Sequence, residues 1–371
     1  MRSRFRWTRI VLHRSGHGHY ALAFGCVQMR GSKHAQGLTR TAKPFGATTN
    51  YHAEEGALLN WKRFLAKHSP LLILAALCIV LAISSENFRS AGNLQNIALR
   101  TCVVSIIAVG QILVILTGGI DLSVGSLAAL GGAVGCLSMK AGVPVLPSIL
   151  LGSCCGMLCG AINGVLVTKG RIPPFIVTLG MMMSARGVVM LLTGAKPVFG
   201  LPAGINFLGG KEGWWIPVII ALVITAVFAI ILTYTRFGRG LYAMGGNMSA
   251  ARLSGINVDG MRLVAYSLCG LLAGFAGMML ASRVGIGDPS AAEGYELDAI
   301  AACVMGGASL TGGEGGTFGA LAGALIMNVL VNYCNLVGVE VHWQRVLVGT
   351  LIVALVYYDN LRKRRANLLQ D

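Results

Sequence analysis

From about residue 70 onward, long apolar stretches follow one another, separated by short polar or glycine-containing breaks. A helix needs about 20 mostly apolar residues to cross a bilayer, and most of these stretches approach that length. The pattern predicts ten spans, at 70–83, 101–118, 122–138, 145–168, 172–194, 214–235, 263–282, 297–310, 317–337 and 343–358. The third and eighth are short, which predicts tilted or partly re-entrant helices. The predicted fold class is an all-α polytopic membrane protein.

Composition supports this class and limits the partners. Of the 371 residues, 55% are hydrophobic and 12% are charged, whereas soluble domains carry about 25% charged residues. The net charge is +16, with 12 of the 30 Lys and Arg before Pro70 and four more at 362–365. Cytoplasmic flanks of membrane spans explain this distribution. A nucleic-acid-binding protein would need a basic folded domain, so we expect contact with membrane lipid and none with nucleic acid.

The chain divides into three segments by composition. Residues 1–56 are basic and have no hydrophobic period, which predicts a disordered extension, with Met29 as an alternative start of translation. The predicted membrane domain covers 57–361, and a basic tail covers 362–371. With the N-terminus cytoplasmic, the inner loops and tail carry ten Lys and Arg and the outer loops six. This bias predicts cytoplasmic termini.

Glycine spacing predicts how the helices pack. Gly152, Gly156, Gly160 and Gly164 lie on one face of the fourth span. Such a stripe lets another helix approach closely. Shorter pairs repeat the spacing at Gly270 and Gly274, and at Gly319 and Gly323.

An internal repeat links two breaks between spans. The segment "LTGGIDLSVG" (116–125) is echoed by "LTGGEGGTFG" (310–319), 194 residues further on. Internal duplications are common in transporter folds. We interpret both segments as reused structural turns, with their signature residues Gly118, Gly119, Asp121, Gly125, Gly312, Gly313 and Gly319.

Motifs for enzymatic chemistry are missing from the sequence. It contains no Walker A pattern, which would bind ATP phosphates, and no Ser-His-Asp or Cys-His arrangement. The ten cysteines lack the spacing of a disulfide framework or zinc site. We therefore expect no catalytic residue, cofactor or metal on this chain.

Four ionisable residues lie within the predicted spans: Asp121, Arg186, Asp298 and Arg345. Such residues are costly in lipid and should face protein or water. Asp121 follows a Gly-Gly break and precedes an apolar run, so we expect it to cap the following helix. A substrate or gating contact is the less favoured alternative.

The longest predicted inner loop, 236–262, contains a candidate docking helix. Asn247 is a suitable N-cap, and Gly255 is a suitable stop. The seven residues "MSAARLS" between them can make about two helical turns, which are unstable in isolation. Packing on this chain or on a partner must therefore hold the helix, if the segment is more than a surface loop.

Four segments together resemble a known family: "GQILVILTGGIDLSVGSLAALGGAV" (110–134), "PPFIVTLGMMMSARG" (173–187), "GGNMSAARLSGINV" (245–258) and "GYELDAIAACVMGGASLTGGEG" (294–315). They are similar to the permease subunit of ribose-type sugar importers of the ATP-binding-cassette (ABC) class. The resemblance covers about residues 60–360. It implies a type II importer fold of about ten helices and a location in the bacterial inner membrane.

The resemblance also implies partners and residue roles. The partners are a second permease copy in a homodimer, a cytoplasmic ABC ATPase and a periplasmic sugar-binding protein. The ATPase-coupling loop would comprise Arg239, Asn247, Ala251, Arg252, Leu253 and Gly255. The translocation path would run near Phe175, Thr178, Met181 and Met182.

Three alternatives remain open at this point. They are an ion-coupled secondary carrier, an ABC permease for another solute (an autoinducer, a nucleoside or a branched-chain amino acid), and a membrane scaffold.

Overall fold

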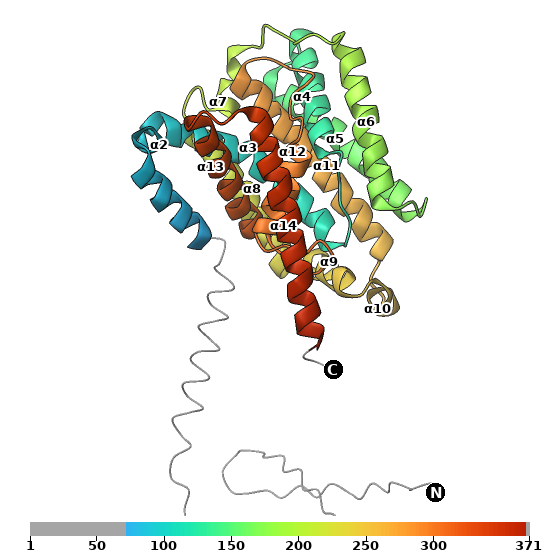
Figure 1. The fold of residues 1–371 in the computed structure, drawn as a ribbon. Coiled ribbons are helices and arrows are strands. Elements are labelled where there is room, and N and C mark those ends of the chain that lie inside the picture. The colour runs from blue at the N-terminus through green and yellow to red at the C-terminus, as the bar shows by residue number, and fades with distance from the viewer. Residues whose placement is uncertain (1–71, 369–371) are drawn as a thin grey trace, which may run out of the picture. The chain divides into compact units, whose positions relative to one another are not determined.

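The computed structural model describes residues 72–368, which are almost entirely helical apart from connecting loops and an isolated β-bridge between Val198 and Gly287 (Figure 1). An initial helix covers Leu72–Ser84. It is followed by α2 (Glu86–Arg89), α3 (Ala91–Leu116), α4 (Val124–Lys140), α5 (Val145–Thr168), α6 (Pro174–Thr193), η1 (Ala203–Ile205), α7 (Asn206–Gly209), α8 (Trp215–Tyr234), α9 (Arg236–Gly246), α10 (Met248–Leu253), α11 (Val258–Val284), α12 (Tyr295–Met305), α13 (Thr317–Leu336) and α14 (Val341–Leu368).

A helix occupies each of the ten predicted spans. Six of them, α3, α5, α6, α8, α11 and α13, are long and apolar enough to cross a membrane. The third and eighth predicted spans are short, as expected: α4 has 17 residues and α12 only 11. At 1.5 Å per residue, α12 is about 16 Å long, so it cannot cross a bilayer by itself.

Helix α3 forms the centre of the described bundle. Every residue from 101 to 116 is buried, and apolar side chains occupy all sides of this segment, with Thr101, Ser105 and Gln111 as its polar residues. A helix that is apolar all round is expected to be buried on all sides. Helices α8, α11, α12 and α13 pack around it.

The predicted glycine stripe on α5 packs against α11. A Cβ on Gly156 would overlap the Gly270 carbonyl oxygen, and one on Gly160 would overlap the Tyr266 carbonyl oxygen. Gly152 lies next to Gly274 on the same interface. The start of α5 contacts the end of α11, and the end of α5 contacts the start of α11, so the two helices are antiparallel. The packing interpretation of the stripe is confirmed.

The same device joins α12 to α13. Gly319 packs on the backbone of Gly306, and Gly323 packs on the backbone of Ala302. These contacts need glycine because the backbones touch without an intervening side chain.

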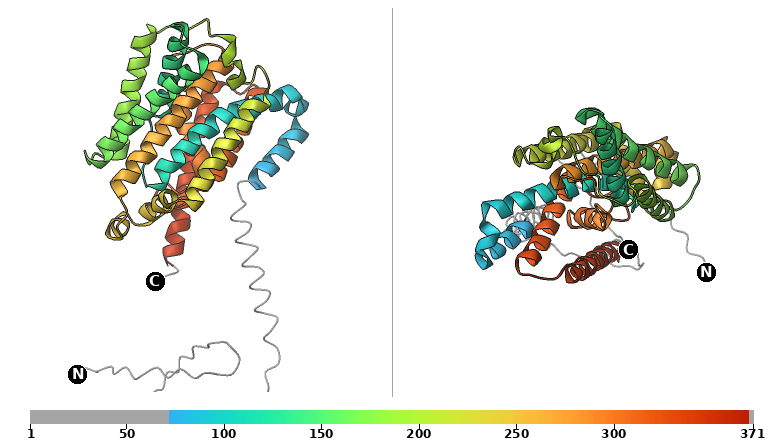
Figure 2. Two further views of the ribbon diagram at one scale, coloured as in Figure 1. Left: turned by 180° about the vertical axis from the view of Figure 1, so that it is seen from behind. Right: turned by 90° about the horizontal axis from the view of Figure 1, so that it is seen from above.

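The outer helices turn apolar side chains away from the bundle. On α6, Leu191 is 83% exposed, and on α5, Leu146 is 66% exposed. Figure 2 shows α5 and α6 at one side of the bundle and the first helices at the other. Apolar surfaces on this scale suit a lipid environment.

Two predicted segments lie outside the described residues. The extension 1–56 is one, and the end of the tail, 369–371, is the other. Their predicted disorder and cytoplasmic location stay predictions.

Candidate functional site at the α9–α10 end

Helices α9 and α10 lie at the end of the bundle toward which the C-terminal part of α14 extends (Figure 1). Residues 236–246, expected to be part of a loop, form the helix α9. Thr235 begins this helix, since its hydroxyl accepts a hydrogen bond from the Gly238 N–H at 3.2 Å. Leu241 and Met244 are buried. Four of the eleven residues of α9 are glycines, which disfavour a helix. Tertiary packing overrides this low helix propensity.

Helix α10 begins and ends where the sequence predicts. The Asn247 carboxamide oxygen accepts from the Ala250 N–H at 2.9 Å, and Gly255 adopts a left-handed φ of +81° two residues after Leu253. Ala251 is buried on the inner side of α10. Leu253 is 90% exposed. A six-residue helix is thus held by its caps and by one buried residue while presenting a large apolar side chain outward.

An ion pair ties α10 to the start of α11. The Arg252 guanidinium donates to the Asp259 carboxylate at 2.6 Å, and both side chains are about half exposed. Such exposed pairs contribute at most about 1 kcal/mol. Arg239 of α9 donates to the Tyr234 carbonyl oxygen at 3.1 Å.

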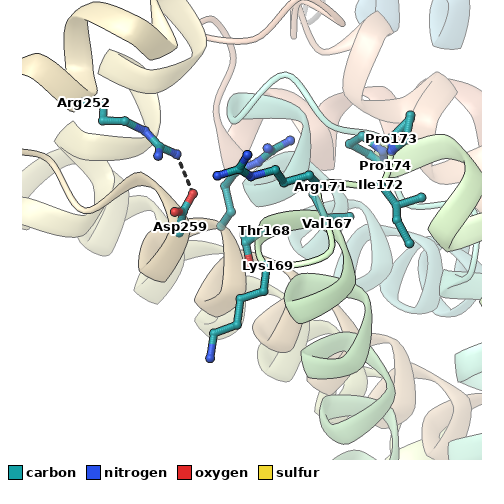
Figure 3. Close-up of a pocket in the computed structure, with 10 residues that line it drawn as sticks. Val167, Thr168, Lys169, Arg171, Ile172, Pro173, Pro174, Arg252 and Asp259 are labelled. Carbon is teal, nitrogen blue, oxygen red and sulfur yellow. Dashed lines mark hydrogen bonds and ion pairs between the residues drawn. The ribbon is translucent and has the colours of Figure 1, made fainter.

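A basic groove of about 590 Å³ lies beside α10 (Figure 3). Lys169, Arg171, Arg252 and Arg262 line it, and Asp259 is the single carboxylate among the lining residues. Arg171 has a left-handed φ of 52°, which non-glycine residues seldom adopt. The groove therefore lies between the α5–α6 turn and the residues of α10 and α11, and the side chains that line it carry a net positive charge.

The two repeated turns meet beneath α9. The Gly313 N–H donates to the Leu116 carbonyl oxygen at 3.1 Å, and the Gly118 backbone lies against Thr311 and Gly312. Gly245 of α9 is wedged against both turns, because a Cβ there would overlap the Gly313 nitrogen and the Leu116 oxygen. Helix α9 is therefore seated on the end of α3 and on the loop between α12 and α13.

A tyrosine strengthens this seat. The Tyr242 hydroxyl donates to the Gly315 carbonyl oxygen at 2.8 Å. Burial raises the pKa of the Tyr242 phenol above its ordinary value, so the phenol keeps its donor proton. Residues 236–246 were expected to be a loop, so no sequence pattern singled out Tyr242.

The prediction that Asp121 caps the following helix is wrong in register. Ser123 is the N-cap of α4. Asp121 is fully buried, and its Oδ1 accepts from the Ser123 N–H at 2.8 Å and from the Ser123 hydroxyl at 2.6 Å. The carboxylate therefore closes a local turn ahead of the helix instead of receiving N–H groups from the first turn of α4.

Two further side chains hold this turn and were not singled out from the sequence. The Gln111 carboxamide pairs with the backbone of Asp121. Its oxygen accepts from the Asp121 N–H, and its nitrogen donates to the Asp121 carbonyl oxygen, both at 3.1 Å. Asn163 of α5 donates to the Ser123 hydroxyl at 3.0 Å. A buried amide in an apolar run was the available signal for each, because such groups need partners.

The residues expected near a translocation path differ in burial, and their role in such a path stays a prediction. Thr178 is fully buried, and its hydroxyl lies 3.3 Å from the Ile120 carbonyl oxygen. Phe175 is 56% exposed, and Met181 and Met182 are half-buried. Thr178 thus joins α6 to the first of the two repeated turns.

Comparison with known proteins identifies the class. The family described as "Branched-chain amino acid transport system / permease component" matches residues 93–356. The chain belongs to this permease family. The ribose import permease RbsC of Escherichia coli K12 is 42% identical over 311 residues, covering 81% of this chain and 96% of the relative. RbsC of Bacillus subtilis is 40% identical over 81% of this chain and 94% of the relative.

A permease for another sugar is also similar. The D-allose transport system permease AlsC of Escherichia coli K12 is 36% identical over 85% of this chain and 99% of the relative. No solved structure matches this chain. The resemblance to ribose-type sugar permeases is confirmed, and the chain is a multi-pass inner-membrane permease subunit. Such subunits are not enzymes, because ATP hydrolysis is carried by a separate subunit.

Proposed function

We propose that this chain is the membrane-spanning subunit of an ABC importer that carries a monosaccharide, such as a pentose or hexose, across the inner membrane. A separate ATPase drives it at the α9–α10 end, which is the cytoplasmic side with both chain termini. An exported sugar-binding protein delivers the substrate at the opposite end. Two permease copies form a homodimer. The sugar-permease relatives support the substrate class.

The observation that carries the coupling role is the exposure of Leu253 on α10. The Leu253 side chain is 90% exposed, so burying it against a partner would remove apolar surface from water and favour docking. The basic groove next to it attracts an acidic partner surface. Because Gly245 and Tyr242 connect α9 to both repeated turns, a displacement of α9 and α10 acts on the end of α3 and on the loop between α12 and α13.

The test replaces both outward-facing groups of α10. The double variant Arg252→Glu, Leu253→Asp is expected to reach the membrane at the wild-type level but to lose ATP-dependent sugar uptake and co-purification with the ATPase. The conservative double variant Arg252→Lys, Leu253→Met keeps charge and bulk and is expected to transport normally. Normal uptake by the first variant would rule out docking through α10.

A charge swap separates docking from local stability. The pair Arg252→Glu, Asp259→Arg restores the ion pair in reverse but moves the positive charge from α10 to α11. We expect this variant to stay defective. Full recovery would mean that Arg252 acts only by holding Asp259.

The energy source distinguishes the ion-coupled alternative. Uptake should stop on ATP depletion and should be insensitive to the collapse of proton or sodium gradients. Asp121→Asn and Asp298→Asn should leave any ion dependence unchanged. Uptake that follows an ion gradient and loses this dependence in either variant would favour a secondary carrier.

A further inference from the structure

A second polar region lies at the end of the bundle opposite α10. Helix α3 carries Asn93, Asn96 and Arg100, and α13 carries Asn328, Asn332 and Asn335. Each set recurs at three- and four-residue spacing and so shares one helix face. Polar stripes of this kind are costly in a membrane and mark either helix contacts or solute paths.

Part of this region serves as helix contact. Asn93 and Asn332 exchange two hydrogen bonds between their carboxamides, at 3.0 and 2.7 Å. Asn335 accepts from the Gln344 side chain at 2.7 Å, which ties α14 to α13. These bonds fix the walls of the region.

The remaining groups line open space. Arg100 lines both a small cavity of about 90 Å³ with the asparagines and a cleft of about 420 Å³ between α12 and α14. The buried Arg100 Nε has no hydrogen-bond partner. The larger cleft falls within the roughly 300–1,000 Å³ of small-molecule sites.

The cleft gathers ionisable residues that are far apart in the sequence. Asp298 and Arg345 are two of the ionisable residues within the predicted spans. They line the cleft together with Glu296, Gln344 and Arg100. Arg186 supports the cleft indirectly, since its guanidinium donates to the Pro289 and Ala291 carbonyls at 2.9 and 3.0 Å, in the loop that leads into α12.

The mixture of charges indicates the kind of ligand. Carboxylates, guanidinium groups and a carboxamide offer acceptors and donors side by side, and no single sign dominates as it does in the basic groove at α10. Hydroxyl groups donate and accept at once, so a neutral polyol matches such a lining better than an anion or a cation. Tyr295 adds an aromatic ring to the same wall.

We propose that the cleft between α12 and α14 binds a neutral polyhydroxylated solute, a monosaccharide, during its passage through the permease. This inference rests on the proposed import function and adds the residues that recognise the substrate: Arg100, Glu296, Asp298, Gln344 and Arg345.

Gly349 provides a means of filling the cleft. It lines the cleft on α14, and a Cβ built on it meets no atom within 4 Å. A leucine there enters open space and favours the helix over glycine, so Gly349→Leu should fold. Gly187→Leu on α6 is the matched control, because Gly187 is also a helical glycine with open space around it.

The experiment measures binding of tritiated D-ribose to the purified full-length permease in nanodiscs. Gly349→Leu should weaken binding at least tenfold, whereas Gly187→Leu should bind like the wild type. Arg345→Leu should weaken binding about tenfold, and Arg345→Lys should weaken it less. Unchanged elution and thermal unfolding establish that each variant is folded.

Two outcomes would overturn the inference: no D-ribose binding by the wild type, or equal binding by Gly349→Leu and Gly187→Leu. Displacement of the sugar by sodium chloride at constant ionic strength would point to a cation site and would also overturn it. ATP-dependent uptake by the wild type with its ATPase is measured in parallel. If uptake is present, only the cleft assignment fails; if no sugar is taken up, the proposed function fails.

Discussion

The two turns that begin with Leu-Thr-Gly-Gly have the same start and the same place between paired helices, but they are held in different ways. The first is fixed by side chains of the central helices, because Gln111 pairs with the Asp121 backbone and Asp121 pairs with Ser123. The second has glycine where the first has Asp121, and Tyr242 of α9 holds it from outside. The Gln111 side chain of α3 and the Asp121 side chain thus hold the first copy of the turn, whereas the second copy depends on a hydrogen bond from α9.

Breaking the shared contact of the two turns should have the largest effect. Gly245→Leu places a side chain against backbone atoms of both turns, which cannot move aside without shifting α3 and α12. We expect a loss of about 3 kcal/mol, at the upper end for overpacking, seen as a lower thermal unfolding temperature and loss of uptake. The neighbouring Gly246→Leu points into open space and should be nearly neutral; equal losses would refute the wedge.

Removing the clamp of the first turn should have the next largest effect. Gln111→Leu leaves the buried N–H and carbonyl of Asp121 without their partner, at a cost of about 2 kcal/mol. Ser105→Ala on the same helix removes a hydroxyl that bonds only to the Cys102 carbonyl of α3 and should cost less than about 1 kcal/mol. Denaturant unfolding in detergent measures both, and equal costs would mean that the clamp adds nothing.

Loosening the second turn should have the smallest effect and the most local one. Tyr242→Phe removes one hydrogen bond, worth about 1 kcal/mol, and should speed amide hydrogen exchange at 312–316 while leaving 117–123 unchanged. Because burial raises the Tyr242 pKa, exchange in the wild type should show no step from this phenol below its ordinary pKa of about 10. Faster exchange in both turns would contradict their separate support.

The sequence predicted the helices better than the contacts between polar groups. Ten apolar stretches became ten helices because a bilayer demands satisfied backbone hydrogen bonds over a fixed length. The glycine stripe of α5 was interpreted correctly because its four-residue spacing, which places the glycines on one helix face, is a local property of the chain. Helix α9 was missed because its glycines oppose helix formation and only packing on the two turns stabilises it.

Helix α10 could be predicted from the sequence, whereas the cleft could not. The Asn247 cap and the Gly255 stop are local signals and were found. The cleft joins Arg100, Asp298 and Arg345 from three helices, so no spacing along the chain reveals it. The asparagine spacing on α13 was visible, but its partner on α3 is more than 230 residues away.

By itself, the sequence determined the membrane-spanning class, the position of each span, the close packing of glycine faces and the resemblance to sugar permeases, because hydrophobic length, caps and motifs are local properties of the chain. Only the tertiary structure decided that Asp121 closes a turn instead of capping a helix, that α9 rests on both repeated turns, and that isolated charges share one cleft. These arrangements depend on which buried polar groups meet across helices, and that is fixed by packing in three dimensions.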